Sequence, residues 1–172
     1  MTEPLSLDQV NSLSRNEFIA QFGDIAEHSL WVAEGVEHIR PFHSRDALIN
    51  AFQQSVLTAS EAQQNALIFA HPDLAGRAAK SGDLAEESRR EQQGAGLDRL
   101  SDDEFKRFHE LNDRYRSRFG FPFIFAVSGA TKYQILEAFE TRVGGTQAEE
   151  RLTALAQVLR ILRFRLEARV RA

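Results

Sequence analysis

A histidine that closes an apolar run is the residue of this sequence best placed to move protons. Leu67 to Ala70 precede His71, and Pro72 follows it. Because proline disfavours the helical conformation of the residue before it, we expect a buried helix to stop at His71 and its imidazole to face a cleft. An imidazole titrates near neutral pH, so His71 is a candidate general acid or base. Taken alone, a buried histidine is more commonly a packed, hydrogen-bonded side chain.

An arginine in an apolar helical row is the second candidate. Ala154, Val158, Ile161 and Arg165 are spaced four, three and four residues apart, which places them on one helix face. Because an unpaired buried guanidinium is costly, Arg165 should pair with a carboxylate of the protein or of a ligand. Taken alone, a structural ion pair or a snorkelling side chain explains Arg165 better. Arg163 belongs to the other side of the helix and is the weaker candidate.

A polar segment between these two residues carries a further acid. Ser88 and Glu91 have the spacing of a capping box, in which each side chain bonds the other's backbone donor, and capping alone would explain Glu91. A catalytic role can coexist with capping, because a helix N-terminus offers N–H groups and a positive dipole end to ligand atoms. Asp73 is interpreted as a turn acceptor or helix cap.

The elements that must position these residues are predicted to be helices. Six Ser or Thr residues have Glu or Gln three positions later, a helix-start signal: Ser14/Glu17, Ser60/Gln63, Ser88/Glu91, Ser101/Glu104, Thr131/Gln134 and Thr146/Glu149. Glycines at 23, 120, 144 and 145 fall where helices should end. We expect an all-α fold of about eight or nine helices, at 7–13, 15–22, 25–38, 45–59, 61–70, 88–93, 102–118, 132–143 and 147–169.

Three other segments have a predicted place in this fold. Residues 121–127 look strand-like but lack a pairing partner, so we expect an extended buried connection. The last helix is expected to be central, with one stripe of Leu152, Leu155, Leu159, Leu162 and Leu166 beside the row that Arg165 continues. The polar stretch 76–96 is interpreted as a functional loop. Six phenylalanines at helical spacings are assigned to the core: Phe18, Phe22, Phe52, Phe105, Phe108 and Phe119.

Composition limits the class of protein. A chain of 172 residues with 42% hydrophobic content predicts one compact domain over 1–172. The net charge of -4 gives no field that would attract nucleic acid or an anionic membrane. The absence of cysteine excludes disulfides and thiolate chemistry, and it fits a reducing cytosol. With no signal peptide, no apolar run near the ~20 residues of a membrane span and no Ser-Lys-Leu ending, we expect a soluble, cytoplasmic protein.

Two kinds of site are not expected. Gly94-Ala95-Gly96 is only a weak Gly-x-Gly signal, without a preceding strand or a Walker lysine, which argues against nucleotide binding. His28, His38, His43 and His109 show no His-x-x-x-His pair or acidic partner at metal spacing, so we predict no metal.

Several ordered motifs resemble those of 2-oxo-4-hydroxy-4-carboxy-5-ureidoimidazoline (OHCU) decarboxylases. They are His71-Pro72-Asp73-Leu74-Ala75, Ser88 with Glu91-Gln92, Leu111-Asn112 with Tyr115, and Phe119-Gly120-Phe121-Pro122-Phe123. The resemblance runs from the Phe22-Gly23 and Glu27-His28-Ser29 segments with Trp31 to Arg165-Leu166-Glu167. The junction Ser128-Gly129-Ala130 departs from the more basic connection expected there, which leaves the role of that loop open.

The resemblance implies an all-helical, cofactor-independent homodimer that turns OHCU into S-allantoin late in urate breakdown. It implies His71 and Glu91 as the catalytic pair and Arg165, Ser88 and Gln92 as substrate-binding residues. Pro72 and the backbone around Phe121 and Ile124 would form pocket walls. Which member of the catalytic pair delivers the final proton does not follow from the sequence.

Two alternative functions stay open at this point. The same His/Glu/Arg set could serve another lyase or hydrolase that acts on a related ureido or hydantoin compound, because one fold can carry shifted substrates. A non-enzymatic helical interaction module is the other. The mixed charges of Asp102, Asp103, Glu104, Lys106 and Arg107 argue against it, because such a run usually marks a solvated face.

Overall fold

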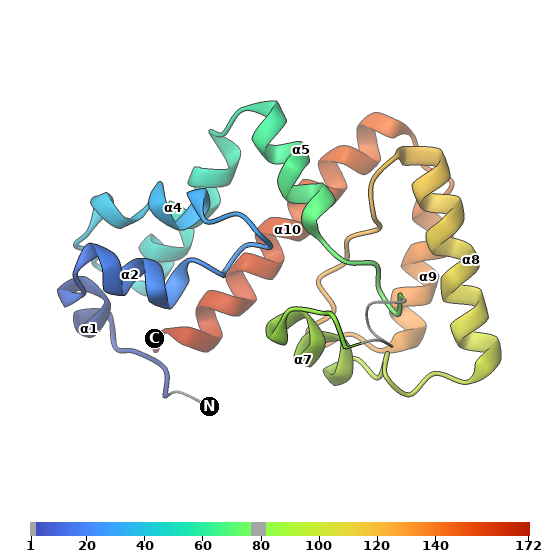
Figure 1. The fold of residues 1–172 in the computed structure, drawn as a ribbon, viewed down its shortest axis with the longest axis horizontal. Coiled ribbons are helices and arrows are strands. Elements are labelled where there is room, and N and C mark those ends of the chain that lie inside the picture. The colour runs from blue at the N-terminus through green and yellow to red at the C-terminus, as the bar shows by residue number, and fades with distance from the viewer. Residues whose placement is uncertain (1–2, 77–81) are drawn as a thin grey trace. The chain divides into compact units, whose positions relative to one another are not determined.

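The structure is a computed structural model that describes residues 3–76 and 82–172, and these residues form helices and connecting turns (Figure 1). Residues 77–81 of the predicted 76–96 loop lie outside the described residues. The α-helices are α1 (Leu7–Ser12), α2 (Arg15–Phe22), α3 (Trp31–Glu34), α4 (Arg45–Leu57), α5 (Glu61–Ala70), α7 (Glu86–Gly94), α8 (Asp102–Phe119), α9 (Lys132–Arg142) and α10 (Gln147–Arg169). A 3-10 turn, η1, spans Glu37–Ile39. The predicted all-α class is confirmed.

Helix starts follow the predicted capping pattern with one exception. Both reciprocal hydrogen bonds form at Ser14/Glu17, Ser60/Gln63, Ser101/Glu104, Thr131/Gln134 and Thr146/Glu149. A further capping box at Ser6/Gln9 starts α1. The exception is Ser88/Glu91, because α7 starts earlier and has Ala85 as its N-cap, without a side-chain hydrogen bond. Ser88 and Glu91 are therefore interior helix residues, and the capping interpretation of Glu91 is wrong.

The expected helix at 25–38 is wrong as well. The chain forms a turn and then the short elements α3 and η1. His28 has a backbone φ of 47°, in the left-handed region that a right-handed helix does not contain. The Ser29 hydroxyl donates to the carbonyl of Glu27 at 2.8 Å and stabilises this turn. The other predicted helices agree with the structure to within two residues at each end.

Two compact units make up the chain, and their order along the sequence is interleaved. Unit 1 comprises Met1–Ala70 and Leu159–Ala172, and unit 2 comprises His71–Val158. Helix α10 therefore begins in unit 2 and ends in unit 1. The first and last segments of unit 1 are joined at an isolated parallel bridge between Leu5 and Val170.

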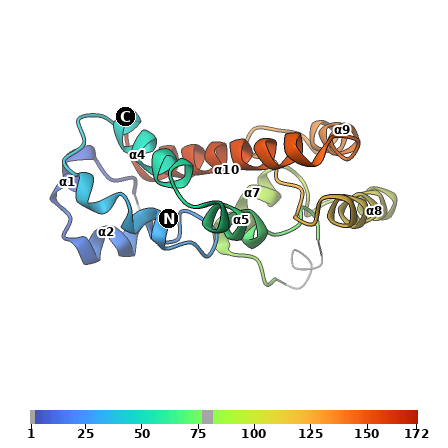
Figure 2. The ribbon, with the colours of Figure 1, turned by 90° about the horizontal axis from the view of Figure 1, so that it is seen from above.

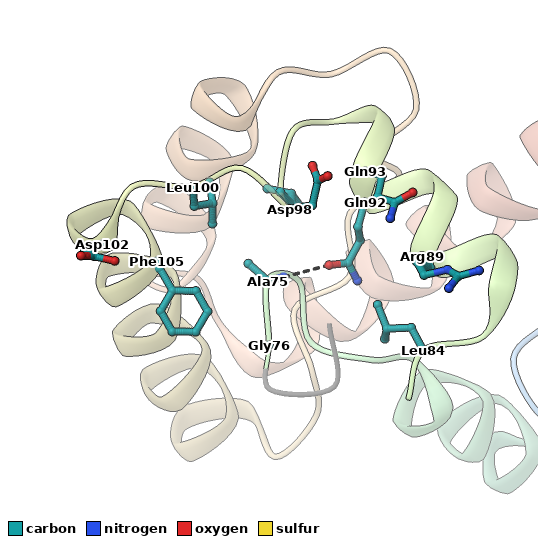
Figure 3. Close-up of a pocket in the computed structure, with 11 residues that line it drawn as sticks. Ala75, Gly76, Leu84, Arg89, Gln92, Gln93, Asp98, Leu100, Asp102 and Phe105 are labelled. Atoms are coloured by element: carbon teal, nitrogen blue, oxygen red, sulfur yellow. Dashed lines mark hydrogen bonds between the residues drawn. The ribbon is translucent and has the colours of Figure 1, made fainter. Parts of the chain in front are cut away.

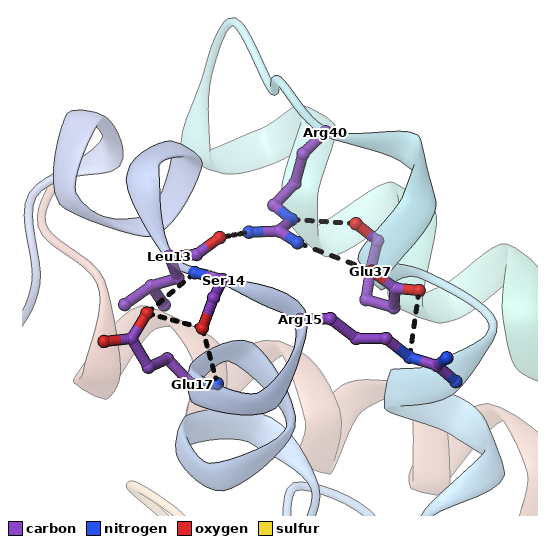
Figure 4. Close-up of polar contacts among 6 residues, drawn as sticks. All are labelled: Leu13, Ser14, Arg15, Glu17, Glu37 and Arg40. Carbon is purple, nitrogen blue, oxygen red and sulfur yellow. Dashed lines mark hydrogen bonds and ion pairs between the residues drawn. The ribbon is translucent and has the colours of Figure 1, made fainter.

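Unit 1 is built around a cluster of aromatic rings. Phe18 and Phe22 of α2 pack with Phe52 of α4, with ring centroids 4.8 to 6.1 Å apart. Figure 4 shows how Arg40, which follows η1, donates both to the carbonyl of Leu13 and, at 2.8 Å, to the carbonyl of Glu37. These bonds tie the connection between α1 and α2 to η1.

Unit 2 contains two helices that lie side by side, α8 and α9, in both views of the ribbon (Figures 1 and 2). Their buried faces meet at Phe108 and Phe139, whose ring centroids are 6.3 Å apart. Gly120 ends α8 with a left-handed φ of 79° and starts the segment 121–127. This segment forms neither helix nor strand and is almost entirely buried, so the predicted extended connection is confirmed. The 128–130 junction is a turn with Gly129 at a φ of 78°.

Helix α10 confirms both predicted apolar stripes except at Leu152. In the leucine stripe Leu155, Leu162 and Leu166 are buried and Leu159 is half-buried. Ala154, Val158 and Ile161 are buried, as predicted. Leu152, expected to begin the leucine stripe, is 65% exposed. Glu150 is buried, and a residue two positions along a helix is rotated by about 200°, so Leu152 points outward. Phe105, assigned to the core, is only half-buried. No helix within residues 3–76 and 82–172 combines the length and apolar character needed to cross a bilayer.

Candidate functional site

His71 directly follows the last residue of α5, as the His-Pro sequence predicted. Its side chain is 5% exposed, and Pro72 after it is half-buried. The next residues form a tight turn in which Ala75 has a φ of 50°, a conformation that side-chain-bearing residues rarely adopt. The structure thus places the imidazole at a helix end, at the start of a turn with an unusual backbone.

Three predicted site residues share one face of α7. Ser88, Glu91 and Gln92 are spaced by three and one, so they lie on adjacent turns of the same helix side. Ser88 and Gln92 are each 5% exposed, and Glu91 is half-buried. The opposite side carries exposed ion pairs of Glu86 with Arg89 and Arg90. The buried side of α7 is therefore polar, whereas the buried face of a surface helix is ordinarily apolar.

The Gln92 carboxamide connects α7 to the turn after His71. Its Oε1 accepts a hydrogen bond from the backbone N–H of Ala75 at 3.0 Å, and its Nε2 lies 3.5 Å from the carbonyl of Asp73. The resemblance implied that Gln92 hydrogen-bonds the ring and ureido groups of a substrate. The bonds within the protein support a role in holding the turn.

A cavity of about 240 Å³ opens beside Gln92 (Figure 3). Its walls are residues of the turn, of α7 and of the segment leading into α8: Ala75, Gly76, Leu84, Arg89, Gln92, Gln93, Leu97, Asp98, Leu100, Asp102 and Phe105. A second cavity, of about 430 Å³, is lined by Pro72, Asp73, Asn112 and Arg116 among others. Gln92 and Pro72 are the predicted site residues that line these two cavities.

Phe121 and Ile124 lie in the extended connection, whose backbone is held by side chains. Arg142 of α9 donates to the carbonyl of Ile124 at 2.7 Å, and Gln157 of α10 accepts from the N–H of Ala126 at 2.8 Å. The ring of Phe121 packs against Tyr115 at a centroid distance of 5.9 Å. These contacts fix the backbone that the resemblance assigns to a pocket wall.

A buried polar group behind this connection was not predicted. The phenol of Tyr115 donates to the carboxylate of Glu150, which also accepts from Nε of Arg142 at 3.0 Å. Burial, together with this hydrogen bond to a carboxylate, raises the pKa of Tyr115. The guanidinium of Arg142 also lies 4.4 Å from the ring centre of Phe123. Of these residues only Tyr115 belongs to a motif quoted from the sequence. No local sequence signal indicates that Tyr115 pairs with Glu150.

Arg165 lies in unit 1, and its guanidinium is paired within that unit. It donates from Nη2 to Oε1 of Glu27 at 3.0 Å and from Nη1 to the carbonyl of Ile25 at 3.1 Å. Both Arg165 and Glu27 are 5% exposed. The expectation that Arg165 pairs with a carboxylate is confirmed for a carboxylate of the protein. Arg163, the weaker candidate, makes half-exposed ion pairs with Asp46 and Glu167.

A metal site does not emerge from the part of the chain that the structure describes. Within residues 3–76 and 82–172, no three His, Asp or Glu side chains are grouped as ligands for an ion.

Comparison with known proteins places these residues in a family. The family model for OHCU decarboxylase matches residues 11–167, a range that contains all eight predicted site residues. The 2-oxo-4-hydroxy-4-carboxy-5-ureidoimidazoline decarboxylase of Haloferax volcanii is 42% identical over 165 residues, which are 96% of this chain and 96% of that protein. The uric acid degradation bifunctional protein of a Bacillus species is 39% identical over 95% of this chain and 32% of its own length.

A solved structure extends this similarity to the fold. The crystal structure of (S)-allantoin synthase superposes with a TM-score of 0.77 and 32% sequence identity. The match covers 96% of this chain and 54% of that one, so this chain spans about half of that protein's length.

Proposed function

The chain belongs to the OHCU decarboxylase family, and from this premise we propose how its residues carry out the reaction. The protein decarboxylates OHCU to allantoin in urate degradation. The observation that carries this function is the extent of the match, which includes every site residue named from the sequence.

The substrate needs little covalent help from the protein. OHCU carries its carboxylate on a carbon that also bears a hydroxyl and adjoins a ring C=N bond. The electrons of the broken C–C bond flow into this C=N bond as carbon dioxide leaves, so the substrate is its own electron sink. The protein must hold the carboxylate in position, manage one or two protons and deliver a proton to a single face to give S-allantoin.

His71 acts as the general acid/base near the hydroxyl and carboxylate of the substrate. Its place at the end of α5, almost fully buried at the start of a held turn, supports this role. Glu91 orients the ring and ureido nitrogens and relays a proton. Its half-buried position in α7, on the same helix side as Ser88 and Gln92, supports this role.

The remaining residues bind substrate. Ser88 and Gln92 offer hydrogen bonds to its ring and ureido groups, and Pro72, Phe121 and Ile124 form walls. Arg165 holds a carboxylate or carbonyl oxygen through its planar set of donors. A guanidinium has five N–H donors, so pairing with Glu27 is compatible with substrate contact.

One experiment tests the function. Freshly generated OHCU is added to the protein, and the circular dichroism of allantoin is followed against the spontaneous reaction. We expect a rate well above the spontaneous one and a single enantiomer. A racemic product formed at the spontaneous rate, or faster turnover of a related ureido or hydantoin compound, would contradict the assignment.

We also propose that residues 1–172 act as one decarboxylase domain in a cytoplasmic homodimer, as the resemblance implies. Light scattering on the eluted protein should give twice the chain mass of 19.4 kDa. A monomer mass at micromolar concentration contradicts the dimer. Unfolding in a single transition, seen alike by ellipticity and by Trp31 fluorescence, is expected for one domain.

A further inference from the structure

The turn after His71 is held by side chains of two different helices. Gln92 of α7 accepts a hydrogen bond from the N–H of Ala75 (Figure 3). Its Nε2 also lies 3.5 Å from the carbonyl oxygen of Asp73. Asn112 of α8 donates from Nδ2 to the carbonyl of Leu74 at 2.9 Å. Consecutive residues of the turn are therefore fixed from separate elements.

Asn112 is an unusual residue for its place in α8. The helix buries Phe108, Leu111, Tyr115 and Phe119 together with Asn112, which is 3% exposed. An amide on an apolar helix face is unfavourable unless its polar atoms find partners. Its Oδ1 is buried and has no hydrogen-bond partner among the described residues, so one polar atom of this amide stays unsatisfied in the apolar interior. The hydrogen bond from its Nδ2 to Leu74 is the contribution that distinguishes Asn112 from a leucine.

A second contact from α8 reaches the same turn. Arg116 lies one helical turn after Asn112 and donates from Nε to Oδ1 of Asp73 at 2.8 Å. This pair is partly exposed, with the Arg116 side chain at 43%. It supports the buried bond of Asn112 from the outer side.

The backbone of the turn requires such support. Ala75 has a left-handed φ of 50°, which costs conformational energy for any residue other than glycine. Strained positions of this kind persist where surrounding contacts determine them, and they occur at functional sites. His71 is three residues from Leu74, and Pro72 between them has a nearly fixed φ. A displacement of Leu74 is therefore transmitted to His71.

We propose that Asn112 is a positioning residue for the decarboxylation: by holding the Leu74 carbonyl, it fixes the turn that sets the place of the His71 imidazole. This inference rests on the proposed function, in which His71 moves the proton. It gives the Leu111-Asn112 motif a physical role.

The test is Asn112→Asp, which keeps the shape of the side chain and replaces the donor with a carboxylate facing a carbonyl. We expect kcat to fall by roughly 10- to 100-fold, because a displaced catalytic group loses its alignment, while KM changes less than about 3-fold. In a His71→Asn background the same change should cost no further rate, because Asn112 acts through His71. If the two substitutions lowered kcat by independent factors that multiply in the double variant, the proposal would be overturned.

A matched control exists in unit 1. Asn11 donates from Nδ2 to the carbonyl of Phe42 at 2.8 Å and belongs to no proposed site segment. Asn11→Asp makes the same chemical change and should leave kcat within about 2-fold of the parent at temperatures below unfolding. An equal loss of kcat in both variants would show a general structural effect and refute the positioning role.

A readout without turnover separates this inference from the proposed function. The histidine ring signals in the NMR spectrum of ligand-free Asn112→Asp should shift for His71 and stay in place for His28, His38 and His43. An unshifted His71 overturns the positioning role, whatever the substrate is. Absence of OHCU turnover in the parent protein would instead overturn the proposed function. If Asn112→Asp does not fold, Arg116→Gln on the outer side is expected to shift the same His71 signals.

Discussion

The carboxylate of Glu27 lies 3.0 Å from the guanidinium of Arg165, and both side chains are almost completely buried. The two residues are 138 positions apart in the sequence and come from the turn before α3 and from α10. The cation in the apolar row of α10 therefore has a fixed counter-charge within unit 1. Because of this pair, a substitution of Arg165 also changes the surroundings of the buried Glu27 carboxylate.

Removing Glu27 should destabilise the protein strongly. Glu27→Ala leaves a buried guanidinium without its carboxylate, and such losses cost about 3–5 kcal/mol. Asp24→Ala is the matched control, because Asp24 pairs with Arg169 at 2.6 Å but is 74% exposed. We expect a cost of about 1 kcal/mol or less for that surface pair. Urea unfolding of both variants measures the difference; equal costs contradict the structural role of Glu27.

Replacing His71 should remove turnover without unfolding the protein. His71→Asn deletes the proposed general acid/base, which typically contributes 10²–10⁴-fold in rate. The helical ellipticity of the variant should match that of the parent. His43→Asn, an identical change at an exposed histidine, should retain full activity. A well-folded His71→Asn protein with normal turnover of OHCU would refute the assignment.

Alanine substitutions at Glu91 and Glu104 should distinguish a catalytic glutamate from a helix-capping one. Both follow a serine by three positions, but only Glu104 closes a capping box, with Ser101. Glu91→Ala is therefore expected to lower kcat by roughly 10²-fold and to change Tm less than Glu104→Ala does. Glu104→Ala should lower Tm and leave kcat unchanged. Kinetics and thermal melts are measured on both variants. A larger loss of Tm in Glu91→Ala than in Glu104→Ala would indicate that Glu91 has a structural role.

Alkaline pH should weaken the protein through Tyr115. Burial and the hydrogen bond to Glu150 raise its pKa above the ordinary value of 10.0. Above about pH 10 the unfolded chain loses this proton while the folded protein keeps it, so the free energy of unfolding decreases as pH rises. Below pH 10 the Tyr115 phenol makes its full contribution to the free energy of unfolding. In Tyr115→Phe this alkaline slope should become shallower; the remainder comes from groups such as Lys132, whose pKa is raised by its hydrogen bond to Glu104. Stability at pH 7 should fall because Glu150 loses a donor.

Urea unfolding between pH 8 and 11 compares the parent with Tyr115→Phe. Absorbance of tyrosinate provides a second check, because the chain has only two tyrosines. The late titration step should be missing from the variant. Parallel stability curves in the two proteins would show that Tyr115 does not carry the pH dependence.

Local signals predicted the helices because capping is a property of neighbouring residues. Pairs such as Ser14 and Glu17 satisfy each other's backbone donors wherever the rest of the chain lies. The same rule failed at Ser88, since α7 begins two positions earlier with Glu86 and Glu87, whose charges suit a helix start without a cap. The helix at 25–38 failed because His28 adopts a positive φ, which composition and periodicity do not indicate.

The placement of His71 was predictable for a similar reason, since the effect of Pro72 acts on its nearest neighbour. The interaction partners of the site residues were not predictable from the sequence. Asn112 reaches Leu74 across 38 positions and Glu150 reaches Tyr115 across 35. Such pairs form only after helices pack, so the sequence indicated that Arg165 needs an anion but not that Glu27 provides one.

The interleaved order of the two units has a consequence for biosynthesis. Unit 2 is continuous in sequence, whereas unit 1 needs residues from Leu159 onward, including the strand-like contact of Val170 with Leu5. All of unit 2 is therefore synthesised before the last part of unit 1. The first segment of unit 1, which contains the aromatic cluster of α2 and α4, is made first, but its unit becomes complete only after the entire sequence of unit 2 has been made.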